Sequence, residues 1–327
     1  MTPAVAVPLV VSVLLAGTGR WLGRVLPPRP AAVLLTLAAL VTALATCFVL
    51  AVLGFTVAAR APDLAQVGRW SAHALATVDP VPVAAGAVAG VLVTALAVAA
   101  VARAVRSGRQ LWAAGAACRR LPHTAGLVVV QDDRPDAYAL PGVSGRVVVS
   151  TGMLRSLPAG ERRVLLAHES AHLAHRHHLY VQLADLAAAA DPLLRPVAAA
   201  VGFAVERWAD EHAAAVVGDR QLAARALARA WLARRGSAPP SPAEPGSPAA
   251  PGSVRGAGLA VTGSAVTERA RALLAPPPRP RRLLAAGLVG LTVLTGSAAV
   301  ITGHDTEHRF EQAQSAYRLA APAPTPH

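Results

Sequence analysis

Residues 164–178 read VLLAHESAHLAHRHH, and the centre of this stretch, from His168 to His172, is HESAH. Side chains four positions apart lie on one face of a helix, so these two histidines can hold one metal ion at roughly 2.0–2.1 Å. Between them, the carboxylate of Glu169 can take a proton from water beside that ion. The pattern predicts a zinc site on a helix over residues 157–180. The competing interpretation is a solvated, histidine-rich helix without a metal.

A second acidic segment favours the metal interpretation. Residues 206–210 read ERWAD and fall on the next strongly helical stretch. A catalytic zinc needs a third protein ligand and one open position, and Glu206 can be that ligand. Asp210, one turn later, can accept the free N–H of a ligating histidine and fix its tautomer. Surface charges on an exposed helix are the alternative. We expect one Zn²⁺ per chain, bound by His168, His172 and Glu206.

The composition is typical of a membrane protein. Of the 327 residues 54% are hydrophobic, and the mean hydropathy is +0.45, which is more apolar than usual for a soluble domain. The excess lies in four uncharged stretches, and a bilayer core takes about 20 helical residues. The stretches are Thr2–Gly19, Ala31–Ala59, Pro80–Ala102 and Leu283–Gly303. The first could instead be a signal peptide, but no basic residue stands at its N-terminal end.

The net charge of +13 comes from Arg alone, because the chain has no Lys. The arginines are spread over loops and helix faces without interleaved aromatic residues, so no direct nucleic-acid binding is expected. Arg in short loops marks the cytoplasmic side. The Arg clusters at 20–29, 103–109 and 279–282 then predict an outside N-terminus, a cytoplasmic central region and an outside C-terminus. We expect a multi-pass protein of a bacterial plasma membrane whose catalytic domain is cytoplasmic.

The chain is predicted to divide into four parts. Residues 1–104 would be three transmembrane helices with short loops, and 105–282 a cytoplasmic domain with the zinc site. Residues 283–303 would be the fourth transmembrane helix, and 304–327 a short, disordered extracytoplasmic tail.

Within the cytoplasmic domain, β-rich runs and helices alternate with turn signals. The linker at 236–252 is rich in Pro, Ser, Ala and Gly and is predicted to be disordered. The predicted elements are β runs at Gly126–Val130 and Arg146–Ser150, and helices at Leu194–Val217, Gln221–Arg235 and Val266–Leu274.

The segments HESAHLAHRHH (168–178) and ERWAD (206–210), preceded by AYALPGVSGRVVVSTGMLRSL (137–157), resemble the gluzincin membrane peptidases. The resemblance implies a mainly α, polytopic membrane protein with a cytoplasmic, zincin-like α+β metallopeptidase domain. Two branches fit, the HtpX/Ste24-like peptidases and the BlaR/MecR-type antirepressor peptidases. The second has three spans before the catalytic domain and one after it, which matches the predicted spans here.

The BlaR/MecR-type resemblance implies a zinc endopeptidase that cleaves a cytoplasmic protein, a winged-helix transcriptional repressor, in signal-triggered proteolysis. The alternatives are an HtpX-like quality-control peptidase and a signalling protein that acts mainly by binding a partner. Two departures limit the resemblance. The penicillin-sensor domain of those receptors would follow the last span, where this chain has residues 304–327, so β-lactam sensing is not implied. His177 stands where that branch often has Asp.

Five residues before the 146–150 run are candidates for substrate binding. By the same resemblance they form a strand at the border of the cleft, where they would pair with the substrate backbone. An ordinary hairpin is the alternative. The residues are Tyr138, Ala139, Leu140, Pro141 and Gly142.

Other polar residues are given minor roles by the sequence. The histidines at 175, 177 and 178 are expected at the surface or around the ligands and not on the metal. His212 or Tyr138 can polarise a substrate carbonyl, and the sequence does not choose between them. Arg269 is expected on a helix surface. Charges at 161–176 disfavour a lipid-facing helix and therefore intramembrane proteolysis.

Overall fold

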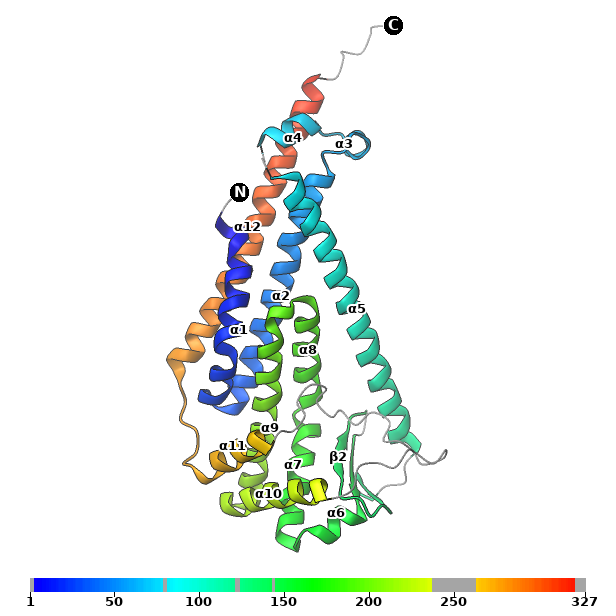
Figure 1. Cartoon of the computed structure of the whole chain (residues 1–327), viewed down its shortest axis with the longest axis vertical. Coiled ribbons are helices and arrows are strands. Elements are labelled where there is room, and N and C mark those ends of the chain that lie inside the picture. The colour runs from blue at the N-terminus through cyan, green and yellow to red at the C-terminus, as the bar shows by residue number, and fades with distance from the viewer. Residues whose placement is uncertain (1–2, 79–80, 121–123, 143–144, 237–262, 321–327) are drawn as a thin grey trace.

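The computed structural model describes residues 3–78, 81–120, 124–142, 145–236 and 263–320. These residues form an elongated, mainly helical molecule with one small sheet near its lower end (Figure 1). The fold class predicted from the sequence, a mainly α polytopic membrane protein with a small α+β part, is confirmed. Most of the predicted linker at 236–252 and the last residues of the tail lie outside the described residues.

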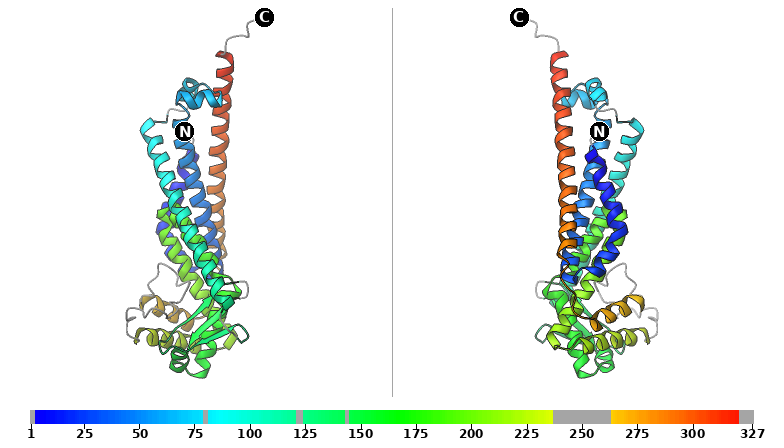
Figure 2. Two further views of the ribbon diagram at one scale, coloured as in Figure 1. Left: turned by 90° about the vertical axis from the view of Figure 1, so that its right-hand side faces the viewer. Right: turned by 90° about the vertical axis from the view of Figure 1, so that its left-hand side faces the viewer.

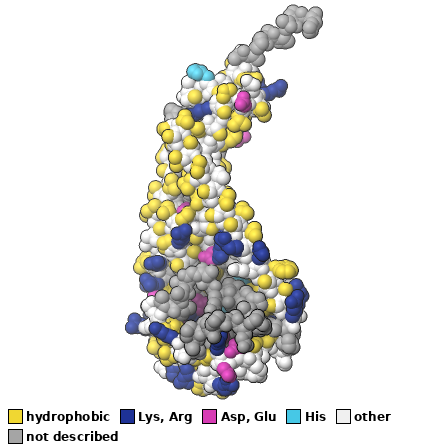
Figure 3. Space-filling model, turned by 45° about the vertical axis from the view of Figure 1, so that its right-hand side comes forward, with side chains coloured by type: hydrophobic (Ala, Val, Ile, Leu, Met, Phe, Trp, Pro, Cys, Tyr) yellow, Lys and Arg dark blue, Asp and Glu magenta, His cyan; other side chains and the backbone are white. Residues whose placement is uncertain are grey.

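Four helices are long and apolar enough to cross a membrane. In length and composition they agree with the four predicted spans, and the helices extend well beyond the apolar stretches because the flanking Ala, Leu, Arg and Gln residues favour helix. On the face shown in Figure 3, hydrophobic side chains are spread along the shaft that these helices form, and Arg side chains gather around the lower end. The helices are α1 (Val7–Val25, preceded by a 3-10 turn at Pro3–Ala6), α2 (Pro28–Ala58), α5 (Val83–Arg120) and α12 (Arg282–Ala320).

The prediction of a disordered tail is wrong for residues 304–320, because α12 continues through them (Figure 2). One face of this extension is partly buried, and Ala313 on it is fully buried. Phe310 stacks on Phe55 with ring centroids 5.5 Å apart and meets Trp70 edge-on at 5.2 Å. This aromatic contact stabilises the helix although its sequence is polar.

The loop between α2 and α5 contains two short helices, α3 (Pro62–Gly68) and α4 (Ala72–Val78). Helix α4 packs against the end of α12, and the backbone N–H of Ser71 donates to the carbonyl of Ala313. The loop is therefore folded onto the last helix.

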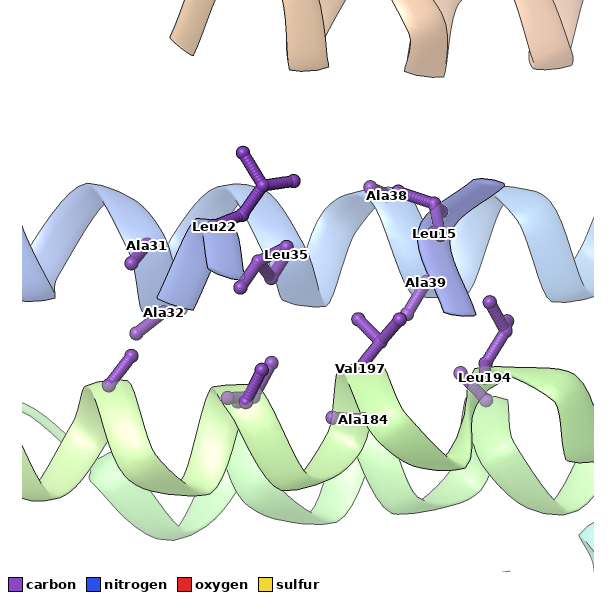
Figure 4. Packing of buried hydrophobic residues seen from close by; sticks show 14 of the residues in the cluster. Leu15, Leu22, Ala31, Ala32, Leu35, Ala38, Ala39, Ala184, Leu194 and Val197 are labelled. Atoms are coloured by element: carbon purple, nitrogen blue, oxygen red, sulfur yellow. The ribbon is translucent and has the colours of Figure 1, made fainter. Parts of the chain in front are cut away.

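A helical hairpin shares a core with the spans. It consists of α8 (His177–Ala190), a 3-10 turn (Pro192–Leu194) and α9 (Arg195–Val217), and it packs against α1, α2 and α5. Figure 4 shows apolar side chains of the hairpin facing those of α1 and α2. The interface uses many Ala residues, which allow close approach of helices. Part of the predicted domain 105–282 therefore stands beside the membrane helices. The residues of this shared core that Figure 4 labels are Leu15, Leu22, Ala31, Ala32, Leu35, Ala38, Ala39, Ala184, Leu194 and Val197.

The tip of the hairpin is held by polar contacts among apolar helices. Asp191 is buried, and its carboxylate accepts hydrogen bonds from the hydroxyls of Ser12 on α1 and Thr46 on α2. Its other oxygen accepts from the backbone N–H of Leu193. A buried carboxylate costs free energy unless it is hydrogen-bonded, so these bonds fix the position of the tip.

The sheet has three short strands, β1 (Leu127–Val130), β2 (Ala137–Leu140) and β3 (Arg146–Ser150). Their order is β1-β3-β2, with β1 parallel and β2 antiparallel to β3. Both predicted β runs are confirmed. Helix α6 (Thr151–Ser156) follows β3 directly and begins where the Ser150 hydroxyl accepts from the backbone N–H of Met153. In the described residues β2 is an edge strand, and it lies against α7.

The helix predicted over 157–180 is two helices, α7 (Ala159–Ala174) and α8. At the break Arg176 has a φ of 51°, a left-handed conformation that non-glycine residues adopt rarely. The sequence carries no Gly or Pro at this point. The break turns the chain so that His177 is buried against His172 and against Trp208 of α9, and the contact with Trp208 is a tertiary one.

Two further helices agree with the prediction. Helix α10 (Arg220–Gly236) follows Asp219, whose carboxylate accepts from the backbone N–H of Leu222. Helix α11 (Gly263–Leu274) packs against α10 and α9. Helices α9 and α10 thus pack against α7 at the lower end of the molecule, and α11 covers α9 and α10 there (Figure 1).

Candidate metal centre

The two histidines of the HESAH stretch face each other on α7. The Nε2 atoms of His168 and His172 are 3.2 Å apart, and both side chains are largely buried. This is the i, i+4 arrangement expected on one face of a helix.

Glu206 on α9 completes a three-ligand group. Its carboxylate oxygens lie 3.7 Å from His168 Nε2 and 3.6 Å from His172 Nε2. Ligand atoms around a tetrahedral zinc at about 2.0–2.1 Å are roughly 3.3 Å apart. The three side chains therefore have the chemistry and nearly the spacing of a zinc site, and in the described residues they form the one group of three or more such ligands.

A carboxylate fixes the orientation of the first histidine. Asp210 Oδ1 lies 3.0 Å from His168 Nδ1. With the proton of the imidazole held on Nδ1, the lone pair of Nε2 points to the metal position. Asp210 stands where the sequence predicted it, and its role as an orienting group remains a prediction.

His177 stands in the same relation to the second histidine. Its Nδ1 lies 3.2 Å from His172 Nδ1, and its ring is fully buried against Trp208. If His172 donates from Nδ1, its Nε2 is free to bind a metal. The neighbouring His175 instead stacks on Trp208 and contacts His212 at 3.3 Å, away from the three-ligand group.

Arg269 is a residue of the candidate centre that the sequence interpretation missed. The prediction that it lies on a helix surface is wrong: its side chain is 7% exposed and donates two hydrogen bonds of 2.7 Å to Asp210. It also lies 2.8 Å from Glu206. Arg269 comes from α11, so this helix contributes to the centre across the segment that is not described.

These charges shift the pKa values of the acidic groups. Burial alone would raise the pKa of Glu206, but Arg269 and the two histidines outweigh it and lower the value to about 2. The same competition, dominated by Arg269, places the pKa of Asp210 well below its usual range. Both carboxylates are therefore charged at neutral pH, and Arg269 neutralises one of the two charges. A net negative charge remains for a cation.

The pKa values of His168 and His172 shift in opposite directions. Burial lowers the pKa of His172 to about 4. Burial acts in the same sense on His168, but the hydrogen bond and charge of Asp210 raise its pKa. His172 is thus neutral near pH 7, which is the state that binds a metal.

Glu169 is buried on α7 with 8% of its surface exposed. Burial raises its pKa, and the positive charges of His168 and Arg234 act against this. A carboxyl group whose pKa is closer to neutrality accepts and returns a proton more readily at neutral pH. Its position next to the metal ligands agrees with the role that the sequence predicts.

The candidate substrate residues lie on and directly after β2. The N–H of Ser150 donates to the carbonyl of Asp136, and the alternation of an antiparallel ladder then directs the backbone of Tyr138 and Leu140 toward β3. The backbone of Ala139 faces the other edge. On that edge Arg234 donates to the carbonyl of Ala137 at 2.7 Å. Pro141 and Gly142 follow the strand, and Pro141 has no N–H to offer a partner.

Arg269→Ala is expected to lower the free energy of unfolding by about 3 kcal/mol, because it leaves the buried carboxylate of Asp210 and the partly exposed carboxylate of Glu206 without their cation. Arg269→Lys should restore only part of this stability, since an ammonium group cannot form the bidentate contact with Asp210. Denaturant unfolding of the full chain in detergent measures both. Arg271→Ala, at an exposed position of the same helix, is the control. Equal stability of the Arg269→Ala and Arg271→Ala variants would contradict the assignment.

Comparison with known proteins supports a metallopeptidase. Residues 99–190 match the model of Peptidase family M48, and no curated protein and no solved structure matches the chain. The matched residues run from α5 to the end of α8 and include His168, Glu169 and His172; Glu206 and Arg269 lie outside the match. The BlaR/MecR-type resemblance remains a prediction. Together with four helices apolar enough to cross a membrane, the match supports a membrane-associated peptidase of the M48 metallopeptidase family.

Proposed function

We propose that this protein is a membrane-anchored, zinc-dependent endopeptidase. The observation that carries the proposal is the spacing of His168 Nε2, His172 Nε2 and the Glu206 carboxylate. Two imidazoles and one carboxylate are the ligands of many catalytic zinc sites, which leave a fourth position open. Asp210 and His177 would hold the two imidazole rings, and Arg269 would hold Glu206 and Asp210.

Glu169 is the general base of the proposed reaction. A bound zinc ion would polarise the peptide carbonyl and lower the pKa of adjacent water. The water oxygen forms a bond to the carbonyl carbon while Glu169 accepts a proton. Glu169 then returns this proton to the amide nitrogen, and the carbon–nitrogen bond breaks. The products are a carboxylic acid and an amine, so no further reactant is needed.

The proposal is tested with the full chain in detergent or in lipid nanodiscs. Cleavage of an unfolded protein should stop when a chelator removes the metal and should return when zinc is added. Cleavage that persists in the chelated, metal-free protein would overturn the proposal.

We infer that substrates bind along the free edge of β2. The backbone of Ala139 faces this edge, and its N–H and carbonyl groups can extend the sheet by one substrate strand. The edge lies beside α7, which carries His168, Glu169 and His172. A substrate in this position would be extended, which favours unfolded segments and loops over folded domains.

Ala139→Pro should lower kcat/KM about 3–10-fold, because it removes one N–H and a hydrogen bond contributes about 0.5–1.5 kcal/mol. Proline is tolerated on edge strands, so zinc content and unfolding should change little. Ala139→Ser keeps the N–H and is the matched control. If both variants cleave a peptide substrate equally well, the Ala139 N–H does not bind the substrate.

The biological role that we propose is signal-triggered cleavage of a cytoplasmic protein, with a winged-helix repressor as the expected substrate. The hairpin of α8 and α9 supports regulation through the membrane part. Its tip contacts α1 and α2 through Asp191, and its other end carries Glu206. Helices packed in this way shift between discrete arrangements, so a movement of α1 or α2 can reach the metal ligands.

Membrane-protein quality control is the alternative role. Cleavage of a candidate repressor and of a misfolded membrane protein by the same full-chain preparation separates the two. The isolated domain is unsuitable, because it would expose the apolar face of the hairpin. The cytoplasmic orientation is supported by the Arg side chains around the lower end of the molecule (Figure 3), and reporters placed after Gly236 and after Arg318 should lie in opposite compartments.

A further inference from the structure

The outer extension of α12 carries a second pair of histidines with the spacing of a metal site. His304 and His308 are four positions apart, and their Nε2 atoms are 3.0 Å apart. The corresponding distance in the pair on α7 is 3.2 Å. The side chain of His308 is 56% exposed, so an ion has direct access. The extension lies at the end of the molecule opposite the α7 site (Figures 1 and 2).

A carboxylate orients one of these imidazoles. Glu311 Oε2 lies 3.3 Å from His308 Nδ1. If Glu311 accepts the Nδ1–H, then His308 Nε2 carries a free lone pair that points to His304. The same order of carboxylate, imidazole and metal position occurs at Asp210 and His168. Such outer carboxylates fix the tautomer and increase the basicity of a ligating histidine.

The backbone under the pair is held in place. Phe310 packs against Phe55 and Trp70, and Ala313 accepts the hydrogen bond from Ser71. The turn from His304 to His308 therefore belongs to a helix that is docked on α2 and α4. A fixed helix turn lowers the entropy that the two side chains lose on binding an ion.

We propose that His304 and His308 form a second binding site for a first-row transition metal ion. Two neutral imidazoles select Cu²⁺, Ni²⁺ or Zn²⁺ over Mg²⁺ and Ca²⁺. Water would fill the remaining positions, so the site binds more weakly than the three-ligand group on α7 and α9. The affinity order should follow the Irving–Williams series, with Cu²⁺ tighter than Ni²⁺. The site does not depend on the proposed peptidase activity.

The test is calorimetric titration of the purified full chain in detergent, after its own metal content has been measured. Ni²⁺ and Cu²⁺ are the probes. We expect one additional equivalent to bind to the unmodified chain, and this binding should be lost in His304→Ala/His308→Ala. Glu311→Ala should weaken it about tenfold, as the loss of an outer carboxylate does at other histidine sites. The electron paramagnetic resonance spectrum of bound Cu²⁺ should show nitrogen ligands that the double variant lacks.

Two further variants make the result decisive. His304→Ala/Gln312→His removes one histidine and adds another at an exposed position one turn after His308. The new pair is again four residues apart, so this variant should bind the additional equivalent of metal. His212→Ala breaks another close pair, His175 and His212, and should leave this equivalent unchanged. Loss in His212→Ala with retention in His304→Ala/His308→Ala would place the ion at the wrong end and overturn the proposal. Equal binding in all variants would also overturn it.

Discussion

Replacement of His168 or Glu206 by Ala is expected to give a protein that is purified without zinc. Each change removes one of the three proposed protein ligands. Loss of even an outer partner of a ligand weakens metal binding about 10–100-fold, so the loss of a ligand itself should have a larger effect. Elemental analysis of the full chain measures zinc per chain, and the same preparations should show no peptide cleavage.

The control for the metal prediction is His178→Ala. This residue belongs to the same histidine-rich stretch but has no place in the three-ligand group. The variant should keep one zinc per chain, and circular dichroism should show that all variants are folded. One zinc per chain in both the His168→Ala and Glu206→Ala proteins would show that the ligand set is wrong.

Glu169→Gln should lower kcat by about 10²–10⁴-fold, the usual contribution of a general base, and should leave the zinc content unchanged. The amide keeps the shape of the side chain but cannot accept the proton of the attacking water. A single-turnover cleavage assay with a defined peptide measures the effect on the chemical step.

Glu161→Gln is the matched control for the general base. Glu161 is a buried glutamate on the same helix, but its partner is Arg229, 3.0 Å away. This variant undergoes the same chemical change at a position away from the metal ligands, so its kcat should stay near that of the unmodified chain. If the two variants were equally active, Glu169 would not be the general base.

The sequence by itself determined the features that depend on local periodicity. His168 and His172 lie on one helix face because four residues make about one turn. The four apolar helices follow from composition, since a bilayer core requires about 20 uncharged residues. Glu206 could be named as the third candidate ligand from chemistry alone, because a catalytic zinc site needs a further protein ligand beside two histidines.

Only the tertiary structure decided how distant segments meet. Arg269 reads as a surface residue because nothing near it in the chain shows that α11 docks on α9. Its contact with Asp210 joins residues that are far apart in sequence, and the stability of such a pair comes from burial in the fold. The turn at Arg176 is similar, since its left-handed backbone accompanies the burial of His177 against Trp208 of α9.

The sequence also could not predict which apolar helices pack against one another. An apolar face shows that a helix packs against another element. It does not determine which element this is, because dispersion and hydrophobic contacts are not directional. The hairpin of α8 and α9 could therefore be predicted as helical, while its place against α1 and α2 could not. The same holds for residues 304–320. Their polar composition indicated disorder, and the contact of Phe310 with Phe55 and Trp70 makes them a helix, because burial of one aromatic side chain offsets part of the entropy of ordering the chain.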